Sequence, residues 1–383
     1  MDHDLIIRGG RLADGTGAPL READIAVRDG LISAIAAPGT LAGTARETID
    51  ATGLLVTPGF VDIHTHYDGQ AVWDERLQPS SWHGVTTAVM GNCGVGFAPV
   101  RTADHARLIE LMEGVEDIPG AALHEGLSWQ WESFGQYLDA VAERPHDMDI
   151  AAHLPHGALR VYVMGERGAR LEEATPDDIA RMRALAGEAV RAGAIGFSTS
   201  RSLNHRSIKG EPTPGLRATE AELTGIALGL RDAGRGVLQF ISDFDTPSLD
   251  EEFAMLRRVV AASGRPMSFS LAQRHSSPHG YRKLLALVAQ AQADGLPIRA
   301  QVAPRPVGVL LGLQGSRNPF SSCPAYIAIA HLPLAERVAL LRQPALRAQL
   351  LQEIHEVPAT GVFRAQMMGW ARMFPMDDAP DYE

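Results

Sequence analysis

The chain has 383 residues, a formal net charge of -11 and two cysteines. This length exceeds what one small core needs and predicts one large α/β domain with a smaller attachment. The negative charge argues against nucleic acid or an anionic membrane as a partner, and two cysteines do not make a disulfide framework.

Short β-rich runs broken by Gly, Asp and Pro make up the amino-terminal part, and no helical period of useful length occurs there. We therefore predict a small β-domain over residues 1–57 and a main domain over residues 58–383. The start, "MDHDLIIRGG", lacks the pattern of a signal peptide, and no apolar run is long enough to cross a bilayer. We expect a cytoplasmic protein without a membrane partner.

From residue 59 on, short apolar runs alternate with helical segments. Such runs are typical of strands buried on both faces of a parallel sheet. One helix is marked by a Thr175 cap, by Pro176 in its first turn and by Gly193 at its end. A closed (β/α) barrel needs eight strands. We predict an α/β fold of the TIM-barrel type with seven visible strands, at residues 59–64, 85–91, 149–153, 194–198, 236–242, 267–273 and 298–303.

The first of these runs ends in "GFVDIHTHYDGQ", residues 59–70. In a strand, residues two apart point to the same face, so His64 and His66 should aim in one direction. The carboxyl end of a barrel strand is where active sites are built, and two imidazoles there suit a zinc ion. The alternative interpretation is a pair of loop histidines that bind nothing.

Four stretches resemble a known family. "LLVTPGFVDIHTHYD" is similar to the amidohydrolase superfamily, while "HGVTTAVMGNCGVGFAP", "PHGALR" and "GFSTSR" resemble its N-acyl-D-amino-acid deacylase (D-aminoacylase) group. The resemblance implies a metal-dependent barrel that hydrolyses a linear amide by metal-activated water. It implies one or two Zn²⁺ ions and a small N-acyl amino acid or related amide as the substrate. The metal-binding residues of the group match His64, His66 and Cys93.

Lysine is scarce in this chain, and neither Lys209 nor Lys283 falls on a predicted strand. Many members of the superfamily bridge two metal ions with a carboxylated lysine. This chain has no lysine on a predicted strand that could form such a bridge. Cys93 lies after the second strand between Gly91 and Gly94 and offers a thiolate ligand instead. The alternative for Cys93 is a small thiol packed at a tight turn, which is the interpretation we prefer for Cys323.

Strands five and six depart from the family pattern, which has histidine ligands near their ends. Gln239 and Gln273 stand near those places, and amide oxygens are poor zinc ligands. Asp243 and His275 lie close by as possible replacements. Arginine can bind a substrate carboxylate through two parallel hydrogen bonds. We predict substrate contacts, with ordinary loop polarity as the alternative for each, for His156, Arg201, His205, Gln239, Asp243 and Gln273.

The catalytic aspartate of the family lies near the end of an eighth strand, so we expect it beyond Glu383 and assign no catalytic residue. The chain then resembles a carboxyl-terminally shortened member: either the sequence is truncated, or another chain supplies the missing part. Two other functions stay open. One is hydrolysis of a cyclic amide, as in dihydroorotase-like or hydantoinase-like enzymes, which the lysine-free strands disfavour. The other is an incomplete barrel that binds a ligand without turnover. A homo-oligomer is also left open.

Overall fold

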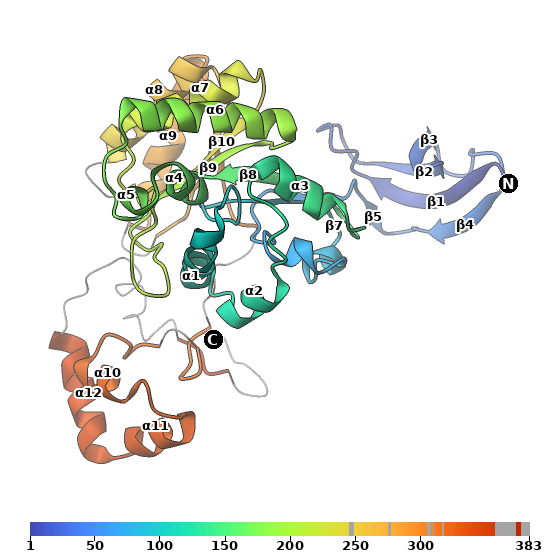
Figure 1. Cartoon of the computed structure of the whole chain (residues 1–383). Helices are drawn as coiled ribbons and strands as arrows, with labels where there is room; N and C mark the ends of the chain where they lie inside the picture. Colours follow the sequence, from blue (N-terminus) through green and yellow to red (C-terminus); the bar gives the residue numbers. More distant parts are fainter. Residues whose placement is uncertain are drawn as a thin grey trace. The chain divides into compact units, whose positions relative to one another are not determined.

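The structure is a computed structural model (Figure 1), and it describes residues 1–244, 249–274, 277–304, 308, 310–315, 318–356 and 373–376. The chain divides into two compact units. One contains Met1–Asp62 and Gln78–Thr87, and the other contains Ile63–Leu77 and Ala88–Glu383. The predicted division into a small β-domain at residues 1–57 and a barrel domain at residues 58–383 remains a prediction.

A small sheet occupies the amino-terminal part. Its strands follow the order β3-β2-β1-β4, and β5 also pairs with β1. Strand β1 pairs antiparallel with β2 and parallel with β4. Buried Asp24 of β2 accepts hydrogen bonds from the backbone N–H groups of Gly9 in β1 and Gly39 after β3, both at 2.9 Å, and thereby ties the loop at Gly39 to the sheet. The strands are β1 (His3–Leu12), β2 (Arg21–Arg28), β3 (Leu31–Ala36), β4 (Ala45–Asp50) and β5 (Leu55–Val56).

Seven further strands form one sheet with the order β12-β11-β10-β9-β8-β7-β6. Neighbours in this sheet are also consecutive in the chain, and the pairs from β8 to β12 are parallel. The predicted α/β class, with seven strands of a TIM-type barrel and a small amino-terminal sheet, is therefore confirmed. The strands are β6 (Phe60–Asp62), β7 (Val85–Met90), β8 (Asp149–Pro155), β9 (Gly196–Arg201), β10 (Val237–Ser242), β11 (Met267–Ser270) and β12 (Ile298–Gln301).

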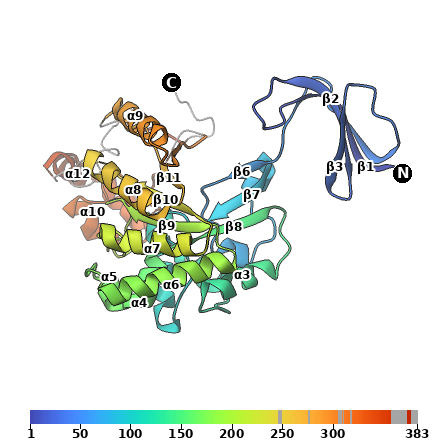
Figure 2. The same ribbon diagram turned by 90° about the horizontal axis from the view of Figure 1, so that it is seen from above.

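Helices connect these strands. Helix α6 (Pro176–Ala192) packs on α7 (Glu220–Asp232), which packs on α8 (Leu249–Ser263), and Figure 2 shows the three side by side along the sheet. The Thr175 side chain caps α6 and Gly193 ends it, as predicted. The other helices before β12 are α1 (His105–Glu116), α2 (Gly120–Gly126), α3 (Phe134–Ala142), α4 (His156–Met164), α5 (Glu166–Ala169), α9 (Gly280–Ala293) and the 3₁₀ turns η1 (Gln70–Val72), η2 (Ser80–His83) and η3 (Thr102–Asp104).

Three helices follow β12: α10 (Pro324–Ile329), α11 (Leu334–Leu341) and α12 (Pro344–Glu356). Cys323 is buried in their apolar cluster beside Tyr326, which agrees with a packing role for this thiol. Within the described residues, no helix has the length and apolar character that a membrane span requires.

Candidate metal centre

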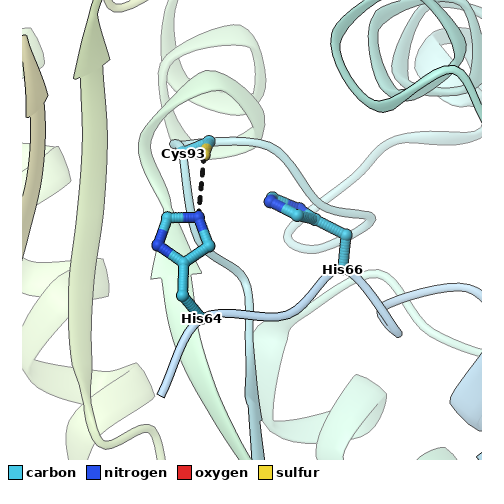
Figure 3. A group of neighbouring side chains, drawn as sticks. All are labelled: His64, His66 and Cys93. Atoms are coloured by element: carbon cyan, nitrogen blue, oxygen red, sulfur yellow. Dashed lines mark hydrogen bonds between the residues drawn. The ribbon is translucent and has the colours of Figure 1, made fainter. Parts of the chain in front are cut away.

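Three predicted ligands converge in the structure. The possible ligand atoms of His64, His66 and Cys93 all lie within 4.8 Å of one another (Figure 3). The Nε2 atom of His64 is 3.2 Å from the Sγ atom of Cys93. The two imidazoles come from the segment after β6 and the thiol comes from the segment after β7. Two adjacent strand ends therefore supply the cluster.

Both histidines lie beyond the end of β6, so a loop sets their direction and the strand geometry does not. Thr65, between them, donates from its backbone N–H and from its hydroxyl to the carbonyl of Val89, at 2.9 and 2.8 Å. The Asn92 side chain donates to the carbonyls of Thr65 and Val89. These bonds anchor the histidine loop against β7 and hold both imidazoles beside Cys93.

Cys93 sits in a tight left-handed turn. Its φ is 55°, and Gly91 and Gly94 on either side have φ values of 76° and 69°. A Cβ atom at Gly91 would lie 2.2 Å from the carbonyl oxygen of His153, so only glycine fits there. The backbone N–H of Cys93 donates to the Oε1 atom of buried Gln239 at 3.3 Å. The turn therefore aims the thiol through contacts with strands β8 and β10.

The electrostatics of the cluster suit a cation. Burial lowers the pKa of His66 and of His153 to about 3, so both imidazoles are neutral near pH 7, as metal ligands must be. Burial raises the pKa of the Cys93 thiol well above its usual value, and nearby Glu116 and Asp68 raise it further. A bound cation would reverse this effect by stabilising the thiolate.

Several buried polar atoms around the cluster have no hydrogen-bond partner in the described part of the chain. They include Nδ1 of His66, Nδ1 of His153 and Oδ2 of Asp68. Burial raises the pKa of Asp68 to about 7, and the charge of Glu116 acts in the same direction. Two imidazoles and a thiol among unsatisfied buried groups fit a zinc ion, which prefers nitrogen and sulfur ligands.

The cluster at the ends of β6 and β7 can now be set beside known proteins. Residues 47–370 match the amidohydrolase family. The chain belongs to the amidohydrolase family. The resemblance to the amidohydrolase superfamily is thereby confirmed, and its D-aminoacylase group is confirmed by the relatives and solved structures.

Curated relatives of this amidohydrolase include D-aminoacylase of Alcaligenes xylosoxydans xylosoxydans, which is 40% identical over 197 residues, 51% of this chain and 37% of that protein. N-acyl-D-glutamate deacylase of the same organism is 31% identical over 310 residues, 79% of this chain and 57% of that protein. The chain thus spans between 37% and 57% of the length of these two relatives.

Solved structures agree with this assignment. A D-aminoacylase studied for its binuclear metal centre superposes with a TM-score of 0.67 and 28% identity, covering 92% of this chain and 70% of that chain. N-acyl-D-glutamate deacylase of Bordetella bronchiseptica, in complex with zinc and a phosphonate inhibitor, gives a TM-score of 0.62 and 28% identity. That match covers 80% of this chain and 59% of that chain.

Glu116 is a member of the amidohydrolase site that the sequence analysis missed. It is the last residue of α1, and its Oε1 atom lies 3.2 Å from Nε2 of His66. Burial raises the pKa of Glu116 to about 7. Nothing in the local sequence distinguishes Glu116 from Glu113, which lies on the same helix. Only the packing of α1 identifies it.

Another predicted substrate residue, His205, lies close enough to the cluster for the charges of its histidines to act on the pKa of His205. It is electrostatically coupled to Glu116, His66 and His64. Burial lowers the pKa of His205, and the charge of Glu116 opposes this shift. Its Nδ1 atom is 2.8 Å from the Ser200 hydroxyl. The structure therefore brings His205 to the centre, and its contact with substrate stays a prediction.

Other predicted substrate residues are held by contacts inside the protein. Arg201 donates to Glu252 at 2.8 Å and to the Ala218 carbonyl at 2.7 Å. Asp243, only 8% exposed, accepts from the Ser202 hydroxyl and from the backbone N–H of Leu203, at 2.7 and 2.8 Å. These two residues shape the loops after β9, and their roles in substrate binding stay predictions.

The two glutamines differ from one another. Gln239 is 1% exposed and holds the Cys93 turn, whereas Gln273 is exposed and donates to the carbonyl of Pro278 at 3.0 Å. Substrate binding by either residue stays a prediction. His275, considered as a replacement ligand, lies outside the described residues.

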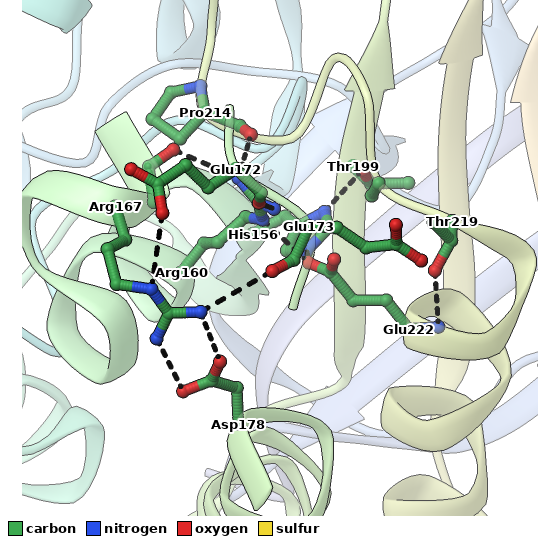
Figure 4. A network of polar contacts seen from close by, with 12 residues as sticks. His156, Arg160, Arg167, Glu172, Glu173, Asp178, Thr199, Pro214, Thr219 and Glu222 are labelled. Atoms are coloured by element: carbon green, nitrogen blue, oxygen red, sulfur yellow. Dashed lines mark hydrogen bonds and ion pairs between the residues drawn. The ribbon is translucent and has the colours of Figure 1, made fainter. Parts of the chain in front are cut away.

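His156 belongs to a buried polar network (Figure 4). Its Nδ1 atom is 2.8 Å from the Thr199 hydroxyl, and its Nε2 atom is 2.9 Å from Oε1 of Glu222. Arg160 donates to the same carboxylate oxygen at 2.8 Å. His156, Arg160 and Glu222 are fully buried. The network braces β9 against α4 and α7, and the predicted substrate role of His156 remains untested.

Proposed function

We propose that this chain is a metal-dependent hydrolase of linear amide bonds that acts on N-acyl amino acids, in the manner of an N-acyl-D-amino-acid deacylase. The observation that carries the proposal is the convergence of His64, His66 and Cys93 within 4.8 Å. Membership in the amidohydrolase family and the similarity to D-aminoacylase and N-acyl-D-glutamate deacylase support it. We propose zinc, as one or two ions, for the metal.

Each of the three residues would have a defined role in binding the metal. His64 and His66 would present neutral imidazole nitrogens to the metal, and Cys93 would present its thiolate. A zinc ion held there supplies a Lewis acid for the amide carbonyl and lowers the pKa of a water molecule. Cys93 is buried and both histidines are partly buried, which would strengthen each electrostatic contact.

Hydrolysis of a cyclic amide is not favoured. The seven described strands of the main sheet contain no lysine that could carry a carboxylate bridge. Both lysines of the chain form ion pairs elsewhere: Lys209 with Glu110 at 2.7 Å and Lys283 with Asp250 at 2.6 Å. The cytoplasmic location and a homo-oligomeric assembly remain predictions.

The function is tested on the whole 383-residue chain, loaded with Zn²⁺. Release of free amino acid is measured over a panel of N-acyl-D- and N-acyl-L-amino acids, with a hydantoin and dihydroorotate as cyclic amides. We expect turnover of at least one N-acyl-D-amino acid, and loss of that turnover after chelation or in His64→Ala. Turnover of cyclic amides alone would contradict the proposal. So would metal-loaded protein without any turnover.

A further inference from the structure

The carboxylate of Glu116 contacts one of the three predicted ligands, His66, and lies near a second, Cys93. Its Oε1 atom lies 3.2 Å from Nε2 of His66. Its charge also acts on the nearby thiol of Cys93 and raises the pKa of that thiol. The side chains of His66 and Glu116 are only 14% and 19% exposed. A carboxylate from α1 therefore meets the side chains of the two strand-end loops at His66.

The spacing of these groups matches a set of ligands around one ion. In a tetrahedral zinc site with bonds of about 2.0–2.2 Å, neighbouring nitrogen and oxygen donors are about 3.3 Å apart. The His66–Glu116 and His64–Cys93 contacts are both 3.2 Å long. Other gaps within the cluster extend to 4.8 Å, so binding an ion would draw the side chains closer together.

Charge balance gives a second argument. Two neutral imidazoles and one thiolate leave a Zn²⁺ site with one net positive charge, and a buried uncompensated charge is costly. The Glu116 carboxylate would neutralise it. Once the metal has deprotonated Cys93, its thiolate and the Glu116 carboxylate would repel each other unless the cation lay between them.

The position of Glu116 is fixed by packing. Leu108, Ile109, Leu111 and Met112 of α1 are buried. The backbone N–H of Ile208 donates to the carbonyl of Glu110 at 2.9 Å. A Cβ atom at Gly114 would lie 2.1 Å from the backbone of Ser207, so the helix and this loop are in close contact. The last turn of α1 is thereby held at the metal centre.

We propose that Glu116 is a fourth ligand of the ion held by His64, His66 and Cys93. The inference rests on the metal centre of the proposed function. It assigns to α1 the oxygen ligand that accompanies two nitrogens and a sulfur.

The test compares zinc binding by the whole chain with binding by Glu116→Ala, with Glu113→Gln on the same helix as the matched control. Affinity is measured by competition with a chromogenic chelator, and circular dichroism checks that each variant is folded. We expect Glu116→Ala to lose more than about 100-fold in affinity, because removal of a residue that only orients a ligand costs about 10–100-fold. The control should bind as the parent does.

A zinc-loaded crystal structure supplies an independent measurement. We expect a Glu116 oxygen within about 2.0–2.2 Å of the ion. A smaller loss of affinity would overturn the inference, and so would a structure in which Glu116 bonds only to His66. If His64→Ala and His66→Ala lose zinc while Glu116→Ala keeps it, the metal centre stands and this inference falls. If all three keep it, both fall.

Discussion

The side-chain oxygen of Gln239 accepts a hydrogen bond from the backbone N–H of Cys93 at 3.3 Å, although 146 positions separate the two residues in the chain. Gln239 lies within β10 and Cys93 lies in the turn after β7, so the bond joins that turn to a strand that is not adjacent to β7 in the sheet. Through it, a residue predicted to contact substrate sets the direction of a predicted metal ligand.

Replacing Gln239 should therefore weaken metal binding. The Gln239→Leu variant leaves the N–H of Cys93 without this acceptor, and we expect zinc affinity to fall by about 10–100-fold, as for other residues that orient a ligand. Gln273→Ala, which removes an exposed glutamine, should leave the affinity unchanged. Chelator competition measures both. Equal affinities for the two variants would show that the bond does not position the thiol.

The paired histidines should each be needed for the metal. His64→Ala and His66→Ala remove one nitrogen donor apiece from a cluster whose ligand atoms lie within 4.8 Å. We expect elemental analysis of the purified variants to show loss of bound zinc. His124→Ala, at an exposed position on α2, serves as the control and should keep it. Unchanged zinc in both ligand variants would reject the assignment.

The two cysteines should differ. Sulfur of Cys93 is expected within about 2.3 Å of zinc, so Cys93→Ser should weaken metal retention strongly. Cys323 is buried in the apolar cluster of α10 and α12, far along the chain from the ligands, and Cys323→Ser should affect stability more than metal content. Metal retention measured after dialysis decides between them. Identical retention would assign Cys93 to packing alone.

Stability should depend on the buried carboxylate of Glu222. Burial alone would raise its pKa, but hydrogen bonds and charges from His156 and Arg160 outweigh this and hold the pKa of Glu222 below its usual value. A carboxylate with a lowered pKa stabilises the fold above the unfolded-state value of about 4.3, and this contribution is lost as the pH falls through the folded-state pKa. Removing one partner of a buried ion pair costs about 3–5 kcal/mol.

The variant Glu222→Gln tests this. Its free energy of unfolding in urea should be about 3–5 kcal/mol lower than that of the parent at pH 7, and the difference should shrink in acid below about pH 4.3. Glu220→Gln, on the same helix, breaks an exposed pair with Arg258 and should cost about 0–1 kcal/mol. If the difference in free energy of unfolding between the parent and Glu222→Gln did not change with pH, ionisation of Glu222 would not contribute to stability.

A larger residue at Gly114 should weaken zinc binding at the metal centre. An added Cβ would lie 2.1 Å from the backbone of Ser207, so Gly114→Ala must shift the last turn of α1. We expect a loss of about 1–3 kcal/mol in stability from overpacking, together with weaker zinc binding through Glu116. Gly312→Ala, where a Cβ meets nothing within 4 Å, should change neither. If the variant bound zinc as tightly as the parent, the position of α1 would have no effect on the metal centre.

The sequence alone predicted the strands of the main sheet and the three converging ligands. Apolar runs report burial over a few residues, and each of the seven runs became a strand. The His64 and His66 pair was found because it follows such a run directly, and parallel strands place their carboxyl ends at one edge of a sheet. Cys93 was found through the resemblance to the D-aminoacylase group, which its place after the next run supports. These are local signals, so they survive without knowledge of the fold.

Tertiary structure decided the rest. Glu116 reaches His66 because α1 packs against the loop around Ser207, and no local pattern records that contact. His156 and Arg201 carry the chemistry of substrate-binding residues, yet the fold gives them carboxylate partners in the interior. A polar side chain can bond to whatever group lies within about 3 Å, and distant parts of the chain determine which group that is. The residue type thus determines whether a side chain can act as a ligand. The packing of helices on the sheet determines which group that side chain contacts.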